Sequence, residues 1–336
     1  MKKILVTGGL GFIGSHTVVE LQHAGFEVII IDDLSNSTLD VLDNIFEITG
    51  KKPDFHQVDL KVKSDVKKFF DKTKVDGIIH FAAFKAVGES VQKPLDYYEN
   101  NIGSLVYLLQ EMRDRNIDNF IFSSSCTVYG QADELPITEN APTKPAESPY
   151  GNTKQIGEEI IREASKAYNF NAIALRYFNP IGAHDSIKIG ELPLGVPQNL
   201  IPFITQTAVG IRKELSIFGD DYPTKDGTAL RDYIHVVDLA KAHIAALQRL
   251  LDKKNKDNFE FFNVGTGKGS SVLEIVKSFE KVSSKKLNYK IVGRREGDVT
   301  AAYADTTLAS KELNWKTEKT LDEALESAWK WQQSLK

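Results

Sequence analysis

The chain begins with a short apolar run, which is followed by a glycine-rich turn and then by a helical pattern of apolar residues. Residues 3–7 (KILVT) have the composition of a buried strand, and helically spaced apolar side chains follow from residue 13; the glycines of the turn are Gly8, Gly11 and Gly14. Such a turn places the free N–H groups and the positive dipole end of a helix beyond the strand. Because glycines allow close backbone approach, the segment predicts a pyrophosphate site.

A second predicted strand indicates that the ligand of this site is a dinucleotide. Residues 27–31 (EVIII) form the candidate strand, and Asp32 follows where a carboxylate would bind a ribose hydroxyl. The same carboxylate would repel a 2′-phosphate. The sequence therefore predicts NAD rather than NADP as the cofactor.

Short apolar runs alternate with amphipathic segments over the first half of the chain. Strands are expected at residues 54–59, 76–83, 119–123 and 172–177, and helices at residues 37–48, 62–70, 98–112 and 148–168. This alternation predicts an α/β fold with right-handed crossovers and a Rossmann-type doubly wound parallel sheet. Ligands of such a sheet bind beyond the carboxyl ends of its strands, so the loops there should converge on one crevice.

The composition changes after residue 178. Gly, Pro and Asn are frequent at first, and shorter elements then follow: helices from residue 201 and at 237–250 and 272–282, and strands at 215–218 and 259–264. We predict a Rossmann domain over residues 1–178 and a smaller α/β substrate-binding lobe over 179–336, with some elements interleaved between them. Trp329 and Trp331, in an amphipathic C-terminal helix, are expected to be packing anchors.

The charge pattern and the cysteine content limit which kinds of partner and cofactor are expected. The chain has 336 residues, 41% of them apolar, and its acids and bases are interspersed with a formal net charge of −4. This pattern does not favour nucleic acid or a membrane as partner, and no apolar run reaches the length of a membrane span. Cys126 is the single cysteine, and the seven histidines are scattered. We expect a cytoplasmic, metal-free enzyme that acts on a small molecule.

Three side chains suggest a hydride-transfer site. Tyr150 and Lys154 lie four residues apart at the start of a predicted helix, so they share one face, and Ser125 follows the strand at 119–123. The ammonium of Lys154 would stabilise the phenolate of Tyr150 and lower its pKa toward neutrality. Tyr150 could then take a proton from a substrate alcohol to which Ser125 donates a hydrogen bond.

Several segments resemble known families. Residues 7–14 (TGGLGFIG), 123–125 (SSS) and 150–154 (YGNTK) resemble the extended short-chain dehydrogenase/reductase superfamily. Five more resemble, more narrowly, the UDP-glucose 4-epimerase family: residues 84–90 (FKAVGES), 176–180 (RYFNP), 223–228 (PTKDGT), 231–235 (RDYIH) and 294–298 (RREGD). Together these segments span nearly the whole chain.

The resemblance implies two sets of ligand contacts. NAD, bound tightly and regenerated in each turnover, would contact Gly8, Gly11, Phe12, Ile13, Gly14, Asp32, Asp33, Asn36, Ser37, Asp59, Leu60, Phe81, Ala82, Ala83, Lys85, Asn100, Ser123, Tyr150, Lys154, Tyr177 and Phe178. The UDP-sugar would contact Lys85, Ser125, Tyr150, Asn179, Asn199, Leu200, Ser216, Phe218, Arg231, Tyr233, Arg295, Asp298 and Ala302. Independently of the resemblance, Arg231 and Arg295 suit a diphosphate, because guanidinium groups stay charged and match phosphate oxygens.

The resemblance also implies which reaction the protein catalyses and which sugars it accepts. Tyr150 and NAD would oxidise the sugar C4 alcohol, the sugar would turn about the diphosphate, and the hydride would return to the opposite face. Ala302 stands four residues after Asp298, where epimerases restricted to unacetylated sugars resemble one another in carrying tyrosine. A methyl group there should admit an N-acetyl group, so the UDP-N-acetylhexosamines are expected substrates too. Alternatively, Tyr303 fills the space or Ala302 packs in a core.

Other functions remain open at the level of sequence. A dehydratase or another nucleotide-sugar epimerase of the same superfamily is one alternative, although residues 125–128 (SCTV) offer no carboxylate for eliminating water. An ordinary reductase would exchange free NAD(P)H, and a dinucleotide sensor would lack the chemistry. A homodimer through helices at 98–112 and 151–168 is also expected. Ile156, Ile160 and Ile161 permit this bundle but equally suit packing within one chain.

Overall fold

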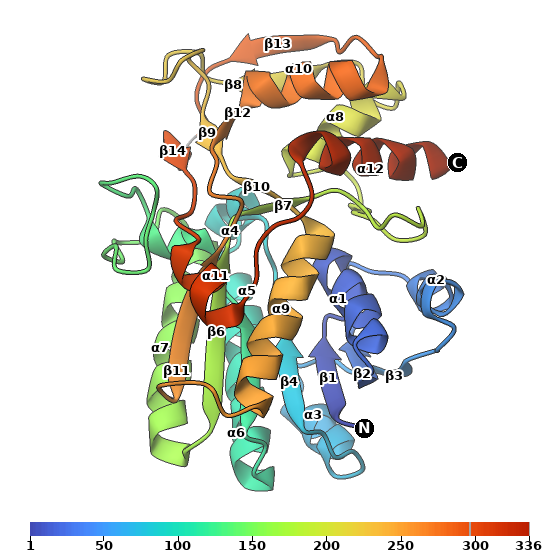
Figure 1. Cartoon of the computed structure of the whole chain (residues 1–336), viewed down its shortest axis with the longest axis vertical. Coiled ribbons are helices and arrows are strands. Elements are labelled where there is room, and N and C mark those ends of the chain that lie inside the picture. The colour runs from blue at the N-terminus through green and yellow to red at the C-terminus, as the bar shows by residue number, and fades with distance from the viewer. Residues whose placement is uncertain (296, 336) are drawn as a thin grey trace.

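A seven-stranded parallel sheet forms the centre of the computed structural model, which describes residues 1–295 and 297–335 (Figure 1). In sheet order the strands are β11 (Phe259–Val264), β6 (Asn171–Tyr177), β5 (Asn119–Ser123), β4 (Gly77–His80), β1 (Lys3–Thr7), β2 (Glu27–Asp32) and β3 (Asp54–Gln57). The winding reverses at β1, which lies between β4 and β2 and so opens a crevice at its carboxyl end. The predicted doubly wound sheet is confirmed.

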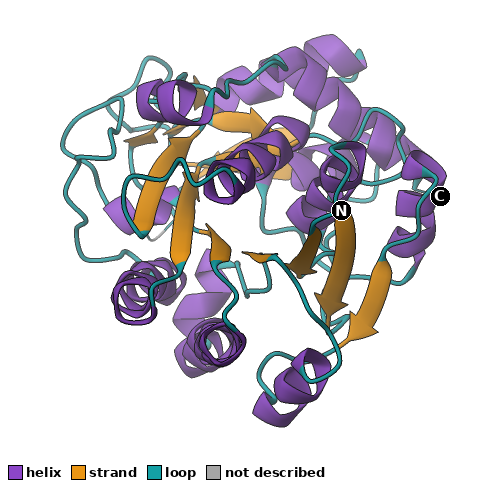
Figure 2. Ribbon diagram, turned by 60° about the horizontal axis from the view of Figure 1, so that its bottom comes forward, coloured by secondary structure: helices purple, strands orange, loops and turns teal. Residues whose placement is uncertain are grey.

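Both faces of this sheet are covered by helices, as Figure 2 shows. In β1, Ile4 and Val6 pack into one hydrophobic cluster and Leu5 packs into the other, because successive strand residues point to opposite faces. The first cluster includes residues of α1 (Phe12–His23), α2 (Asp40–Thr49), α9 (Val236–Leu251) and α11 (Thr307–Leu313). The second includes residues of α3 (Lys63–Phe70), α6 (Ser104–Arg115) and α7 (Pro149–Tyr168). Burial on both faces explains why the strands are continuous apolar runs.

A smaller assembly of short strands lies beyond the carboxyl ends of the large sheet (Figure 1). Its strand pairs are β8 (Leu215–Phe218) with β13 (Tyr289–Val292), β7 (Asn179–Ile181) with β10 (Tyr233–His235), and β9 (Leu230–Arg231) with both β12 (Ser270–Ser271) and β14 (Ala301–Ala302). The helices that pack with them are α8 (Leu200–Ala208), α10 (Val272–Ser283) and α12 (Leu321–Ser334). Trp329 of α12 contacts Phe279 edge-on at 5.6 Å, so it is the packing anchor that the sequence predicted.

Elements from beyond residue 178 also pack with the large sheet, among them one strand and one helix that the sequence predicted. The strand expected at 259–264 is β11, which pairs in parallel with β6, and the helix expected at 237–250 is α9, which packs on α1. The sequence groups both with the smaller lobe and allows for elements interleaved between the two lobes, but it does not identify these two as such elements. The reason is that an apolar strand such as β11 gains most burial beside another buried strand, and its local sequence does not say which one. The division at residue 178 stays a prediction.

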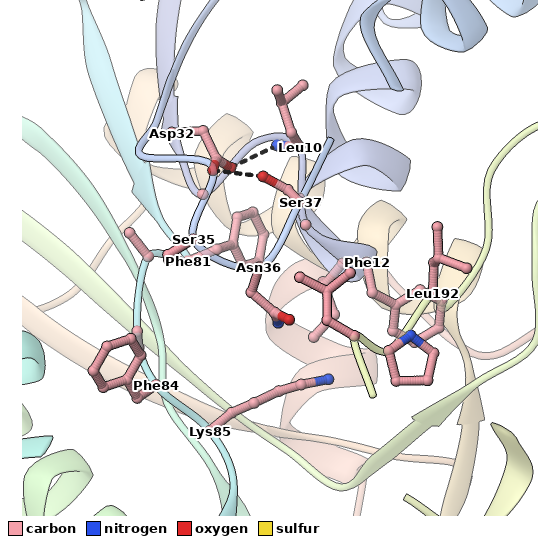
Figure 3. A pocket seen from close by; sticks show the side chains of 18 of the residues that line it. Leu10, Phe12, Asp32, Ser35, Asn36, Ser37, Phe81, Phe84, Lys85 and Leu192 are labelled. Carbon is pink, nitrogen blue, oxygen red and sulfur yellow. Dashed lines mark hydrogen bonds between the residues drawn. The ribbon is translucent and has the colours of Figure 1, made fainter. Parts of the chain in front are cut away.

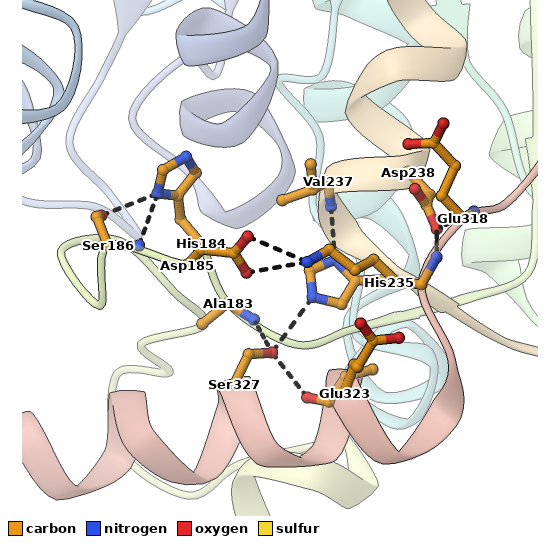
Figure 4. Close-up of polar contacts among 12 residues, drawn as sticks. Ala183, His184, Asp185, Ser186, His235, Val237, Asp238, Glu318, Glu323 and Ser327 are labelled. Carbon is orange, nitrogen blue, oxygen red and sulfur yellow. Dashed lines mark hydrogen bonds and ion pairs between the residues drawn. The ribbon is translucent and has the colours of Figure 1, made fainter.

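Histidine and serine side chains join α9 to the smaller assembly (Figure 4). His235 Nδ1 accepts a hydrogen bond from Val237 N at 3.1 Å and thereby caps the start of α9. Its Nε2 lies 3.3 Å from Ser327 Oγ of α12, and Ser327 also accepts from Ala183 N at 3.0 Å. The end of β10, the start of α9 and the helix α12 are therefore held in one hydrogen-bonded group.

The single helix expected at residues 98–112 consists of three consecutive segments. α5 (Pro94–Tyr98) begins with proline at its first position, a π-helical turn spans Glu99–Gly103, and α6 follows. Within the wide turn, Asn101 Oδ1 accepts from Phe84 N at 2.8 Å and Nδ2 donates to Phe84 O at 3.0 Å. The turn thus fixes the loop that leads to Lys85, consistent with the frequent use of π-turns at functional sites.

The other boundaries differ from the predictions by a few residues, and α4 (Val87–Gln92) lies in a stretch for which no helix or strand was predicted. In the part of the chain that the structure describes, no helix has the length and apolar character needed to cross a membrane. Among the same residues, no group of three or more histidine, cysteine, aspartate or glutamate side chains could hold a metal ion.

Candidate active site

A cavity of about 1010 Å³ lies at the carboxyl ends of the central strands (Figure 3). Every residue predicted to contact the cofactor lines it, except one. The exception is Phe178, which packs instead in a hydrophobic cluster with Val128 and Tyr129. The single crevice expected from the loop positions is therefore present, and the glycine turn, the acidic strand end and the Tyr150–Lys154 pair meet in it.

Two glycines of the turn, Gly8 and Gly14, could not be replaced by residues with side chains. Gly8 has a φ of +68°, and a Cβ on it would lie 2.8 Å from Ala82 N. A Cβ on Gly14 would lie 2.2 Å from Gly8 O, which is far inside contact distance. Gly11 caps α1 without a side chain, so the first N–H groups of the helix face the cavity. This cradle of backbone donors suits a phosphate oxygen.

Asp32 fixes two loops of the cavity wall and is itself 7% exposed. Its Oδ2 accepts from Leu10 N at 3.1 Å, and its Oδ1 accepts from Ser37 Oγ at 2.7 Å, as Figure 3 shows. Leu34 N also donates to Oδ1, at 3.0 Å. The carboxylate therefore ties the glycine turn to the loop after β2, where it lines the cavity.

Tyr150 and Lys154 occupy the first two turns of α7 and are 8% and 4% exposed. Ser148 caps this helix by accepting from Gly151 N at 3.2 Å, which sets where the helix begins. Lys154 Nζ donates to Ser123 O at 2.7 Å and lies 5.8 Å from the centroid of the Tyr150 ring. The two side chains share one face of the helix and both line the cavity.

Burial controls the proton affinity of both groups. It raises the pKa of the Tyr150 phenol well above its ordinary value, with Tyr177 adding to the rise and Ser125 opposing it. Burial also lowers the pKa of the Lys154 ammonium to about 8, against the attraction of Glu158. Burial thus raises the Tyr150 pKa in the protein by itself, and the lowering of that pKa by Lys154 stays a prediction for the protein with its cofactor.

Ser125 lies beside this pair, outside the residues that line the cavity. It precedes a 3₁₀ turn over Cys126–Tyr129, and its Oγ accepts from Thr127 N at 3.2 Å, so the hydroxyl proton is free to be donated elsewhere. Burial raises the pKa of the adjacent Cys126 thiol to about 12, which keeps it protonated and unreactive.

The predicted diphosphate contacts gather in the smaller assembly. Arg231 Nη2 lies 3.4 Å from Asp298 Oδ1, and Arg295 Nη2 donates to the same oxygen at 2.8 Å. The Arg295 guanidinium lies 5.7 Å from the centroid of the Phe218 ring. Two arginines share one carboxylate here, which leaves positive charge for an anionic ligand.

The remaining predicted substrate contacts are spread around these two groups. Asn199 and Lys85 line the cavity. Asn179 of β7 pairs with Tyr233 of β10, a residue that is 7% exposed. The others stand on neighbouring elements: Ser216 on β8, Leu200 at the start of α8 and Ala302 on β14. The structure thus places one set of predicted substrate contacts in the cavity and a second set in the smaller assembly.

Ala302 is 8% exposed and packs in the cluster that also contains Phe178 and Cys126. Its Cα pairs with that of Arg231, so it stands next to this arginine. Tyr303 contacts Gly269: a Cβ on that glycine would lie 2.9 Å from the ring. The ring of Tyr303 thus lies against Gly269, and Ala302 packs among buried residues.

Glu191 and Trp331 are among the residues of the cavity wall that sequence reasoning missed. Glu191 Oε1 accepts from Lys85 Nζ at 3.2 Å and from Asn199 Nδ2 at 2.6 Å. Trp331 Nε1 donates to Glu191 O at 3.0 Å, and its ring lies where a side chain on Gly190 would otherwise be. Trp331 was expected only to anchor packing, yet it lines the cavity. The sequence of the 188–199 segment, punctuated by glycine and proline, was the available signal.

Comparison with known proteins agrees with this site. The family model described as GDP-mannose 4,6 dehydratase matches residues 5–328. The UDP-glucose 4-epimerase of Drosophila melanogaster is 50% identical, over 98% of this chain and 96% of the relative. The solved UDP-glucose 4-epimerase of Bifidobacterium longum, in complex with NAD+ and UDP, is 46% identical with a TM-score of 0.95, over 99% and 98% of the two chains.

A third relative differs in its described substrates. The UDP-Glc/GlcNAc 4-epimerase of Campylobacter jejuni is 36% identical with a TM-score of 0.85, over 99% of both chains. Identity at these levels across nearly the full length, together with the arrangement of the cavity, establishes the family. The chain belongs to the UDP-glucose 4-epimerase family of the extended short-chain dehydrogenase/reductase superfamily.

Proposed function

We propose that this protein interconverts UDP-glucose and UDP-galactose, with NAD held tightly and regenerated in each turnover. The observation that carries the proposal is the meeting of the glycine turn with Tyr150 and Lys154 in one cavity. The relatives that share this full-length pattern are UDP-glucose 4-epimerases.

The residues present fit NAD. Gly8, Gly11 and Gly14 carry no side chains and leave room for a pyrophosphate at the start of α1, and Asp32 stands where it would accept from a ribose hydroxyl. When bound, NAD supplies a hydride acceptor and the positive charge of its nicotinamide ring. That charge favours the ionised form of a nearby phenol, which burial alone disfavours.

The chain's own residues move the proton and hold the substrate. Tyr150 takes the proton of the sugar C4 hydroxyl and later returns it, while Ser125 donates a hydrogen bond to the same oxygen. Lys154, held by the Ser123 carbonyl, provides the charge beside the phenolate. Arg231 and Arg295 hold the diphosphate. A sugar that is gripped mainly through its diphosphate can present either face of the C4 ketone to the cavity.

The decisive test uses the purified protein without added cofactor. Incubation with UDP-galactose should yield UDP-glucose. A dehydratase would release a dehydrated keto sugar, a reductase would consume one NAD(P)H per product, and a dinucleotide sensor would leave the substrate unchanged. Any of these three results would overturn the proposal.

We also propose that the substrates include UDP-N-acetylglucosamine and UDP-N-acetylgalactosamine. The support is the methyl side chain of Ala302 beside Arg231, in a cluster with Cys126, which directly follows Ser125 in the chain. The similarity to a UDP-Glc/GlcNAc 4-epimerase is further support. A methyl group in place of an aromatic ring leaves volume for an acetyl group.

A homodimer through α6 and α7 remains a further proposal. Ile161 is fully buried within the chain, whereas Ile156 and Ile160 are partly exposed, Ile160 while packing against the second hydrophobic cluster. A dimeric mass in solution, lost when both partly exposed isoleucines are changed to glutamate, would support it; a monomeric wild type would overturn it.

A further inference from the structure

A buried ion pair lies behind the Tyr150–Lys154 pair. Glu158 follows Lys154 by one helical turn on α7 and is 6% exposed, and Arg176 of β6 is 5% exposed. Arg176 Nε donates to Glu158 Oε1 at 2.9 Å, and Nη2 donates to Oε2 at 2.6 Å. Because removing two charges from water costs about as much as their attraction returns, stability alone does not explain such a pair.

The carboxylate of the pair holds the start of the segment that carries Ser125. Ser124 is fully buried, and its Oγ donates to Glu158 Oε1 at 2.5 Å. On one side of Ser124 is Ser123, whose carbonyl oxygen accepts from Lys154 Nζ, and on the other side is Ser125. One carboxylate oxygen therefore fixes the residue between two members of the candidate site.

The guanidinium of the pair holds the end of the same segment. Arg176 Nη1 donates to Tyr129 Oη at 2.9 Å, and Tyr129 is fully buried at the end of the 3₁₀ turn. The guanidinium lies 4.0 Å from the centroid of the Phe261 ring, and Tyr129 Oη donates to Asn263 Oδ1 at 2.7 Å. Residues 124 and 129 are thus both fastened to one ion pair, and Ser125 lies between them.

Glu158 also supplies the negative charge nearest in sequence to the ammonium of Lys154. Its attraction raises the pKa of Lys154, against the larger effect of burial. Lys154 would lose its proton at a lower pH without that carboxylate. Both Glu158 and Arg176 lie outside the residues that line the cavity, so any influence on the reaction must pass through the groups that they hold.

We propose that Glu158 and Arg176 are positioning residues. Together they form a clamp that holds segment 124–129 so that Ser125 and Tyr150 can both hydrogen-bond to the same substrate oxygen. Glu158 also keeps Lys154 in its protonated, ammonium form. Only the expected effects on kcat and KM rest on the proposed function. The clamp and the state of Lys154 are properties of the protein that can be measured without turnover.

The test compares Glu158→Gln with a matched control, Glu260→Gln. Glu260 of β11 pairs with Arg249 of α9 at 2.7 Å, and those side chains are 10% and 6% exposed, so the control removes a similarly buried carboxylate away from the cavity. In Glu158→Gln we expect kcat to fall by about 100-fold with KM for UDP-galactose unchanged, because misplacement by about 1 Å costs that much. The control should keep the wild-type kcat.

The second readout is the titration of Lys154 itself. In protein labelled with ¹³C at lysine Cε, the Lys154 signal, identified by its absence in Lys154→Met, should titrate at a lower pH in Glu158→Gln than in the wild type. The alkaline limb of the pH–rate profile should move in the same direction. An unchanged Lys154 titration in a folded Glu158→Gln variant, or an equal loss of kcat in Glu260→Gln, would overturn the inference.

A gentler variant guards against loss of folding. Ser124→Ala keeps the ion pair and removes only the hydrogen bond to Glu158, so we expect a folded protein with kcat lowered about tenfold and KM unchanged. Wild-type kcat in that variant would contradict the clamp. If the wild type does not epimerise UDP-galactose, the proposed function fails, and the titration of Lys154 still decides the role of Glu158.

Discussion

The ammonium of Lys85 donates to the carboxylate of Glu191 at 3.2 Å and so joins two segments that lie 106 residues apart in the sequence. Lys85 follows β4 of the large sheet. Glu191 belongs to the 188–199 segment, and its carbonyl oxygen accepts a hydrogen bond from Trp331 Nε1. Because both residues line the cavity, the contact links two parts of the cavity wall.

We predict that Glu191→Ala retains NAD less well than the wild type. The change releases Lys85 and Asn199, which both donate to the same Glu191 oxygen. Since Lys85 is 48% exposed, the free energy of unfolding should fall by less than about 1 kcal/mol. The measurement is NAD content after exhaustive dialysis, with Glu318→Ala in the exposed Lys241–Glu318 pair as the control. Equal retention in both variants would show that the contact is incidental.

We predict that Tyr150→Phe folds normally and loses catalysis by roughly 100-fold to 10,000-fold. The variant keeps the buried ring and removes only the oxygen that exchanges the proton, so thermal stability should change little. Rates with UDP-galactose and melting curves provide the comparison. Wild-type turnover by Tyr150→Phe would mean that another group acts as the base.

We predict that Lys154→Met is inactive yet more stable than the wild type at neutral pH. Burial lowers the pKa of Lys154 from 10.5 to about 8, so the unfolded chain holds the proton more tightly than the folded chain. The resulting destabilisation, about 3 kcal/mol, is fully present below pH 8 and disappears as the pH rises to 10.5. Methionine has a similar shape and no charge.

Denaturant unfolding of both proteins between pH 7 and 10.5 measures this difference. The stability advantage of Lys154→Met should shrink steadily over that range. A variant that is less stable than the wild type at pH 7 would show that the hydrogen bond to Ser123 contributes more than burial of the charge costs.

Local patterns were enough to predict much of this fold and site. The strand, glycine turn and helix are contiguous, and Tyr150 and Lys154 are separated by one helical turn, so backbone geometry alone brings each set together. By contrast, Trp331 and Glu191 meet across 140 residues. Which residues meet across so long a stretch of sequence depends on how whole helices and strands pack. For the same reason, β11 could not be assigned to its sheet from its own residues.

We predict that cofactor extracted from the denatured protein is NAD and contains little NADP. Asp32 already accepts from Leu10 N and Ser37 Oγ at the cavity wall, so its charge is fixed close to the expected ribose position. A 2′-phosphate there would face a carboxylate at close range. Extraction of mainly NADP would place the ribose elsewhere.

The last prediction concerns substrate breadth. We expect the wild type to turn over both the acetylated and the unacetylated UDP-sugars, and we expect Ala302→Tyr to lose the acetylated pair selectively, by about 100-fold or more in kcat/KM. The reason is that the methyl of Ala302 stands beside Arg231, in a cluster with Phe178, where a tyrosine ring would occupy the volume needed by an acetyl group.

A graded series separates a gate from a packing defect. Ala302 is 8% exposed, so a larger side chain there can also strain the core, at about 1–3 kcal/mol of stability. Ala302→Val should therefore lie between the wild type and Ala302→Tyr in its activity on UDP-N-acetylglucosamine, while kcat/KM for UDP-glucose stays level across the series. If the wild type does not turn over the acetylated pair, or if both sugar pairs lose activity in parallel with melting temperature, Ala302 is not a gate and the specificity of this enzyme is set by other residues.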